Sequence, residues 1–192
     1  MSASAGQISL RLAMSLDGYI ADDDGGYEWI VPVPSPTLDT EHQLPFDDFL
    51  DDVDIVVMGR HCFDQEQHRD YVALGKKVIV ATSTPKLIAT PVEGVDFVGR
   101  DVVEVVKAYR DQGQHCFIFG GGVLVQSFLA ANAVDMLTVG IVPVLLGSGR
   151  ALFLGGYPPL DLSLVDYAVQ DGKARLVYRR RRAAPCRSHL SP

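Results

Sequence analysis

The chain has 192 residues, a formal net charge of −7 and hydrophobic side chains at 47% of its positions. This size and composition are typical of a single domain with a sizeable core, and no run of 18 or more apolar residues predicts a membrane span. The acidic balance argues against nucleic acid as the main partner, because binding to phosphates requires an excess of Lys and Arg.

The N-terminus has no charged segment followed by an apolar one, so the sequence predicts no signal peptide and a cytoplasmic location. The three cysteines, Cys62, Cys116 and Cys186, are far apart and form no C-x-x-C pair, which favours free thiols over a disulfide framework. No spacing typical of a zinc site is present, and no metal is expected.

Charge is unevenly spread along the chain. Residues 17–70 hold fifteen of the 24 acidic residues, whereas residues 179–182 are four arginines. We interpret the arginine run as a solvated strand end, with a contact to RNA or a membrane as the alternative. We expect one domain over residues 8–182, with flexible termini at residues 1–7 and 183–192.

The N-terminal third predicts a strand, a long loop and a short helix. Residues 8–16, "ISLRLAMSL", alternate and then become continuously apolar, which indicates a strand. Residues 17–37 are rich in Gly, Asp and Pro, and a loop of this length in a compact domain is usually functional or disordered. Residues 45–53 place apolar side chains at i, i+3, i+4 and i+7, the spacing of an amphipathic helix.

The middle of the chain alternates between strands and helices. Residues 54–59 predict a buried strand, followed directly by a helix or turn. Residues 76–84 form a strand that ends in three hydroxyl residues before a proline, and residues 94–99 form a short strand. Residues 100–113 have the pattern of an amphipathic helix with a glycine just past its end.

The C-terminal part begins with a strand at residues 115–120 and a helix after the glycines that follow it. Residues 134–147 predict a long apolar strand, which Pro143 bends or ends. From residue 162 onward the pattern predicts a β-hairpin whose turn is Asp171-Gly172.

These elements predict an α/β fold. Alternation of strands and helices through residue 130 favours a mostly parallel, twisted mixed sheet with helices on both faces, and the last strands favour an antiparallel C-terminal edge hairpin. In open sheets of this kind, ligands bind beyond the carboxyl ends of the strands.

Three strand ends carry features that suit phosphate: the pair at 59–60, the hydroxyl residues at 82–84 and the glycines at 120–122. Taken alone, each has an ordinary interpretation: the pair at 59–60 is a tight turn, the residues at 82–84 are a polar strand end, and the glycines at 120–122 are a plain turn. Helix N-termini and bare backbone bind phosphate well, so several such sites on one edge fit a ligand with more than one phosphate, such as a dinucleotide. Neither G-x-G-x-x-G nor G-x-x-x-x-G-K-[ST] is present.

The segments "AMSLDGYIA", "VVMGRHCFD", "VIVATST", "IFGGGVLVQSFL" and "PVLLGSG", in this order, resemble the dihydrofolate reductase superfamily. The chain most closely resembles stand-alone relatives of the reductase domain of bacterial riboflavin biosynthesis, over roughly residues 8–180. The resemblance implies a dihydrofolate reductase-like three-layer fold, NADPH as the hydride donor and a homodimer, for which the apolar 134–147 stretch and the C-terminal hairpin would supply surface.

The resemblance also implies which residues hold NADPH. Ala13 and Ile20 would hold the nicotinamide carboxamide. The residues implied for the adenosine and phosphate groups are Gly59, Arg60, Cys62, Thr82, Ser83, Thr84, Gly120, Gly121, Gly122, Val123 and Leu124. A cis Gly-Gly bond is implied in the glycine turn. Val123 stands where dihydrofolate reductases often have a basic residue, so the 2′-phosphate would depend on Arg60, the hydroxyl groups and Lys86.

The expected activity is transfer of a hydride from NADPH to a small pteridine- or pyrimidine-like heterocycle. Alternatives are a riboflavin-pathway reductase acting on a ribosylamino-pyrimidine phosphate, a non-catalytic NADPH-binding module, and a structural dimer partner. Candidate proton donors are Asp47, Asp17 and Glu28, of which Asp47 is preferred because a helix is a rigid platform; Asp17 could instead hold the turn after the first strand. Trp29, as a lid or wall of the pocket, and Asp47 are expected to contact the substrate; the alternatives are that Trp29 is simply buried and that Asp47 is a solvated acid.

Overall fold

The computed structural model describes residues 6–34, 37–84 and 91–181. Its strands are β1 (Gln7–Ser15), β2 (Tyr19–Ala21), β3 (Ile55–Gly59), β4 (Lys77–Ala81), β5 (Val95–Val98), β6 (His115–Gly120), β7 (Met136–Val142), β8 (Arg150–Ala151), β9 (Leu162–Gln170) and β10 (Lys173–Arg180). Its helices are α1 (Phe46–Asp51), α2 (Arg60–Asp64), α3 (His68–Ala73), α4 (Val102–Asp111) and α5 (Gly122–Ala130).

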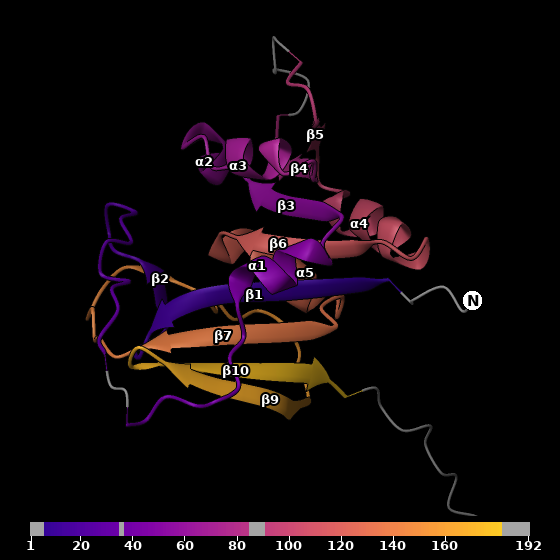
Figure 1. The fold of residues 1–192 in the computed structure, drawn as a ribbon. Coiled ribbons are helices and arrows are strands. Elements are labelled where there is room, and N and C mark those ends of the chain that lie inside the picture. The colour runs from indigo at the N-terminus through magenta and orange to yellow at the C-terminus, as the bar shows by residue number, and fades with distance from the viewer. Residues whose placement is uncertain (1–5, 35–36, 85–90, 182–192) are drawn as a thin grey trace, which may run out of the picture.

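The centre of the molecule is an eight-stranded sheet in the order β5-β4-β3-β6-β1-β7-β10-β9, and a small second sheet pairs β2 with β8 (Figure 1). Neighbouring strands from β5 to β7 are parallel, whereas β10 is antiparallel to both β7 and β9. The predicted fold class, a mostly parallel mixed sheet with an antiparallel edge hairpin, is therefore confirmed.

Helices cover both faces of the sheet because alternate side chains of a strand point to opposite faces. On one face, Val57 and Ile118 belong to a core cluster completed by side chains of α4 and α5. On the other face, Val56 and Phe117 pack with Leu50 of α1 and side chains of α3. The central strands are buried from both sides, which explains their continuous apolar sequence.

The C-terminal hairpin turns at the predicted dipeptide. Asp171 and Gly172 both have positive φ angles, 51° and 71°, as a two-residue type I′ turn requires. The turn sets the register in which Lys173 pairs with Gln170.

Several boundaries differ from the prediction. The strand predicted at 134–147 is shorter, because β7 ends at Val142 before Pro143, which cannot donate to a ladder. The helix or turn predicted directly after Gly59 consists of two short helices, α2 and α3, and the small β2–β8 sheet was not predicted. The strand β1 begins at Gln7, within the stretch predicted to be flexible, and residues 1–5 and 183–192 of the predicted termini lie outside the described residues. Within the described part, no helix has the length and hydropathy to cross a membrane.

Candidate functional site

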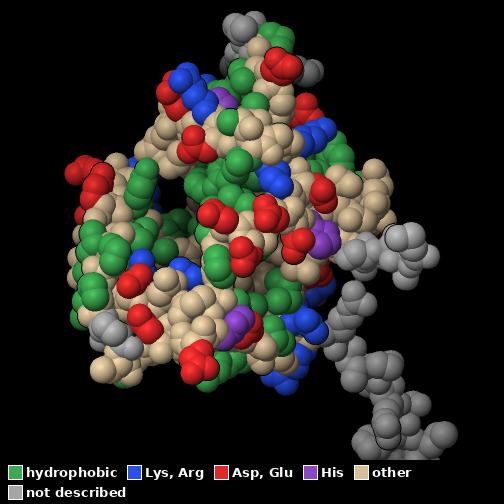
Figure 2. All heavy atoms as spheres, viewed as in Figure 1, with side chains coloured by type: hydrophobic (Ala, Val, Ile, Leu, Met, Phe, Trp, Pro, Cys, Tyr) green, Lys and Arg blue, Asp and Glu red, His purple; other side chains and the backbone are tan. Residues whose placement is uncertain are grey.

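Two adjoining cavities lie at the carboxyl ends of the parallel strands. The larger has a volume of about 820 Å³ and the smaller about 540 Å³. Both are lined by the same five residues at their junction, namely His61, Cys62, Gly121, Gly122 and Arg150. Figure 2 shows the molecule hollowed between the segment that carries β2 and the helices α2 and α3. Together the cavities can hold one elongated ligand or two ligands in contact.

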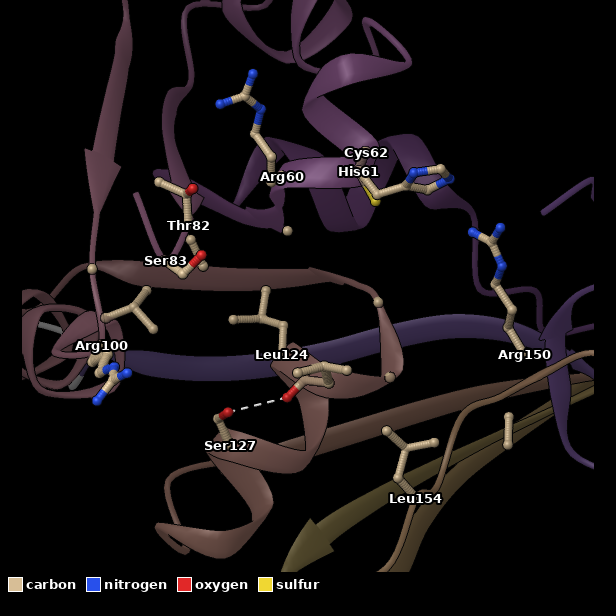
Figure 3. Close-up of a pocket in the computed structure, with 18 of the residues that line it drawn as sticks. Arg60, His61, Cys62, Thr82, Ser83, Arg100, Leu124, Ser127, Arg150 and Leu154 are labelled. Carbon is tan, nitrogen blue, oxygen red and sulfur yellow. Dashed lines mark hydrogen bonds between the residues drawn. The ribbon is translucent and has the colours of Figure 1, made fainter. Parts of the chain in front are cut away.

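The larger cavity brings together the three strand ends singled out in the sequence (Figure 3). Residues 59–62 line it from the end of β3, Thr82 and Ser83 from the end of β4, and residues 121–124 from the glycine turn and the start of α5. Thr84 does not line either cavity; its backbone N–H donates to Thr82 Oγ1 over 3.3 Å. Lys86 lies outside the described residues.

The glycine turn presents bare backbone to both cavities. Gly120 and Gly121 have φ angles of 137° and 68°, and a Cβ atom at Gly121 would meet no protein atom within 4 Å. A Cβ at Gly122 would lie 2.6 Å from the carbonyl oxygen of Ala151, so this position has room only for glycine. The implied cis Gly-Gly bond is wrong, because the described residues contain no cis peptide bond.

Three arginines line the larger cavity, and only Arg60 was predicted. Arg60 Nε donates to Asp64 Oδ1 over 2.7 Å, and its guanidinium lies 5.6 Å from the ring centre of Phe63. Arg100 follows β5, so inspection of that fourth strand end would have found it. Arg150 could not be found in this way, because its position depends on the pairing of β8 with β2.

The smaller cavity has an apolar, largely aromatic wall. Ala13, Ile20 and Gly120 line it, together with the rings of Tyr27, Phe46, Tyr71, Phe117 and Phe119. Burial is the main cause that raises the pKa of the Tyr71 hydroxyl. Such walls suit a flat, ring-shaped ligand, because aromatic rings stack on planar groups.

Polar groups occupy one side of the smaller cavity. Gln65, Gln67 and Asp70 line it from α3 and the segment before it. The side-chain oxygen of Gln67 is buried and has no hydrogen-bond partner among the described residues. Buried polar atoms are almost always paired, so this oxygen is suited to accept a hydrogen bond from a ligand.

Arg11 also lines the smaller cavity and holds the chain that leads into α1. Its guanidinium donates to the carbonyl oxygens of Leu44 and Pro45 over 2.6 and 3.0 Å and lies 4.9 Å from the ring centre of Phe49. Burial, and then the positive charge of Arg175, lower the pKa of Arg11 to about 10. The contacts of Arg11 fix one wall of the cavity.

The four residues predicted for catalysis and substrate contact are absent from the linings of both cavities: Asp17, Glu28, Trp29 and Asp47. The Asp17 carboxylate accepts hydrogen bonds from Ser15 Oγ over 2.5 Å and from the backbone N–H groups of Gly147 and Leu146 over 2.8 and 3.2 Å. These hydrogen bonds lower the pKa of Asp17, and the bond from Ser15 has the largest effect. Asp17 therefore ties the loop after β7 to the end of β1.

The other predicted acids lie on the surface. Asp47 is exposed in the first turn of α1, over which acidic side chains gather (Figure 2). Glu28 is exposed in the loop after β2, and the Trp29 indole N–H is buried without a hydrogen-bond partner among the described residues. Asp70, which the sequence analysis missed, is the only carboxylate that the described chain contributes to either lining.

Cys62 lies at the junction of the two cavities. Its pKa is raised, chiefly by burial, so the thiol form is favoured over the nucleophilic thiolate. In the described ranges there is no group of three or more His, Cys, Asp or Glu side chains that could hold a metal ion. The groups available at the junction are thus backbone amides, His61, a thiol and a guanidinium.

Comparisons with known proteins agree with this architecture. The family model of the RibD C-terminal domain matches residues 7–175. The protein YyaP of Bacillus subtilis (strain 168) is 27% identical over 187 residues, which cover 90% of this chain and 94% of YyaP.

Solved structures with a similar fold include a bacterial protein and a dihydrofolate reductase. A protein from Shewanella sp. PV-4, provisionally named a riboflavin biosynthesis protein, has a TM-score of 0.76 at 29% identity and covers 92% of this chain and 99% of its own. Dihydrofolate reductase from Enterococcus faecalis, complexed with NADP(H) and RAB-propyl, has a TM-score of 0.57 at 21% identity and covers 92% of this chain and 98% of its own. The chain therefore belongs to the RibD C-terminal domain family and has the dihydrofolate reductase-like fold.

Proposed function

We propose that this protein is an NADPH-dependent reductase that transfers a hydride to a small pteridine- or pyrimidine-like heterocycle. The observation that carries the proposal is the pair of joined cavities: three phosphate-compatible strand ends meet around the larger one, which continues into an aromatic-walled one. Membership of a family named for RibD, and a fold shared with a dihydrofolate reductase that holds NADP(H), support the same activity.

The residues present fit NADPH, because the space beside Gly121 admits a group that a side chain would fill. Thr82, Ser83 and Arg100 would hold the adenosine end, and Gly121 and Gly122 would hold the diphosphate. Ala13 and Ile20, in the smaller cavity, would border the nicotinamide. When bound, NADPH supplies the hydride.

The smaller cavity would hold the substrate against the nicotinamide. Phe46, Phe117 and Phe119 would pack on its ring and exclude water, and the unpaired Gln67 oxygen would accept a hydrogen bond from a ring or amino N–H. Reduction of a C=N bond adds a hydride to carbon and a proton to nitrogen, so a proton donor beside the nitrogen would raise the rate.

Asp70 is the group of this chain best placed to give that proton, because it alone brings a carboxyl group to the described cavity walls. We expect Asp70→Asn to lower turnover of a surrogate such as a dihydropteridine by about 10²-fold or more, with unchanged NADPH affinity. Asp47→Asn is the matched variant, and it should have a smaller effect. Loss of turnover in Asp47→Asn with normal turnover in Asp70→Asn would return the role to Asp47.

Selectivity for NADPH over NADH is expected to depend on the arginines at the adenosine end. Arg60 is already paired with Asp64, so we expect Arg100 to contribute more than Arg60 to binding of the 2′-phosphate. Arg100→Ala should weaken NADPH binding by about 1.5–3 kcal/mol, which is the scale of a charge-assisted hydrogen bond. Arg60→Ala should have a smaller effect of the same kind, and NADH binding should hardly change in either variant. Fluorescence titration measures both affinities, and equal losses for the two cofactors would remove these arginines from the 2′-phosphate.

A riboflavin-pathway reductase is the second candidate, and family membership favours it. The substrate of such a reductase carries a phosphate. Arg11 lines the smaller cavity and could supply the positive charge that binds this phosphate. Turnover of the ribosylamino-pyrimidine phosphate at a rate far above that of unphosphorylated pyrimidines and pteridines would select this candidate. Tight NADPH binding without turnover of any of these compounds would indicate a binding module.

We also propose a homodimer formed through the edge strand β9, whose Leu164 and Tyr167 are exposed. Large apolar side chains on an edge strand favour pairing with a second copy. Light scattering at micromolar concentration should give a mass twice that of the 20.9 kDa chain. The variant Tyr167→Asp should shift the measured mass toward that of the monomer. A monomer for the unaltered protein would contradict the proposal.

A further inference from the structure

Among the described residues, Arg150 of β8 is the one Lys or Arg side chain at the junction of the two cavities. It lines both cavities, whereas Arg60 and Arg100 line only the larger one and Arg11 only the smaller one. Figure 3 shows Arg100 and Arg150 on opposite sides of the larger cavity, with the Arg150 side chain directed from β8 toward α2. Burial raises the pKa of Cys62 on α2, and the positive charge of Arg150 is among the smaller effects that oppose this rise.

Arg150 has no carboxylate partner within ion-pair distance among the residues that the structure describes. Its guanidinium lies flat against Gly25, where a Cβ would be 2.8 Å from three guanidinium atoms, and its polar contact is a long bond of 3.4 Å to the Asp24 carbonyl oxygen. Backbone packing thus holds a charge at the cavity wall that no acidic side chain of the described ranges neutralises.

The position of Arg150 is tied to the glycine turn. The next residue, Ala151, is the one whose carbonyl oxygen leaves no room for a side chain at Gly122. Val123, immediately after the turn, is apolar and 71% exposed, so the turn itself carries no cation. The strand β8 therefore brings a guanidinium to the turn from a different part of the chain.

In a dinucleotide the diphosphate joins the two nucleoside halves. If the adenosine half occupies the larger cavity and the nicotinamide half the smaller one, the diphosphate must cross the junction. We infer that Arg150 binds the diphosphate of the dinucleotide and supplies the cation that the glycine turn lacks. This inference rests on the proposed function and assigns a residue to the one group that NADPH and NADH share at the junction.

The test is calorimetric titration of Arg150→Met, which keeps an unbranched apolar side chain at this position and removes the charged guanidinium that packs against Gly25. Affinity for NADPH and for NADH should fall by the same factor, about tenfold to hundredfold, because a charge-assisted hydrogen bond of this strength is lost from a group common to both. Affinity for adenosine 2′-monophosphate, which has no diphosphate, should be unchanged. The loss should shrink at high salt, since the side chain is exposed.

Other outcomes overturn the inference. A loss confined to NADPH would assign Arg150 to the 2′-phosphate, and unchanged affinities would leave it as a surface residue that packs on Gly25. If Arg150→Met does not fold, Arg150→Lys serves instead, and it should retain part of the affinity for both dinucleotides in the same proportion. Failure of the unaltered protein to bind either dinucleotide would instead refute the proposed function, so the two failures are distinguishable.

Discussion

Gly121→Val is expected to abolish dinucleotide binding, with a loss of roughly a hundredfold or more in affinity, while the chain still folds. A side chain at this position would meet no protein atom within 4 Å, so it would extend into the cavity where the diphosphate is proposed to lie. Because Gly121 has a φ of 68°, the substitution also strains the backbone by about 1–3 kcal/mol. Fluorescence titration with NADPH and thermal unfolding separate the two effects.

Gly75→Val is the matched control. Gly75 has a φ of 73°, open space around its Cβ position and no place in either cavity lining. The Gly75→Val variant should lose about as much stability as Gly121→Val and should keep its affinity for NADPH. Unchanged affinity in Gly121→Val, or an equal loss in Gly75→Val, would remove the glycine turn from the binding site.

Phe117→Ala is expected to lower the free energy of unfolding by about 3–5 kcal/mol. Phe117 is 1% exposed on β6, and its ring centre lies 5.1 Å from that of Phe49 at 90° and 6.0 Å from that of Phe119. The truncation would leave a void between the sheet and α1, where the aromatic edges now meet. This loss is a large part of the 5–15 kcal/mol that stabilises a typical domain.

Urea denaturation measures the effect of Phe117→Ala, and Phe153→Ala is its control. Phe153 is 40% exposed, so its truncation should change the free energy of unfolding by about 0.5 kcal/mol or less. A loss below about 1 kcal/mol for Phe117→Ala would mean that the core on the α1 face is packed far more loosely than described.

Much of the fold could be predicted because local signals and packing agree. The buried strands β3, β4 and β6 are continuously apolar, as strands covered on both faces must be, and Asp171-Gly172 defines its turn by backbone conformation alone. The short strands β2 and β8 could not be predicted, because each has too few residues for a pattern and gains its structure only by pairing with the other.

The cavity walls were predictable to the extent that they lie at strand ends. Thr82, Ser83 and the glycine turn meet because the carboxyl ends of parallel strands share one edge of the sheet. The acidic residue in the wall was not predictable, since Asp70 lies on a helix whose rotation is set by the packing of Tyr71 against Phe117 and Phe119. Asp47 also lies on a helix, but it lines neither cavity.

A crystal structure of the protein with NADPH tests the central proposal most directly. The proposal predicts the diphosphate beside Gly121, Gly122 and Arg150, the adenosine 2′-phosphate near Thr82, Ser83 and Arg100, and the nicotinamide in the smaller cavity beside Ala13 and Ile20. A dinucleotide bound outside the two joined cavities, or bound with its adenosine in the smaller one, would contradict it.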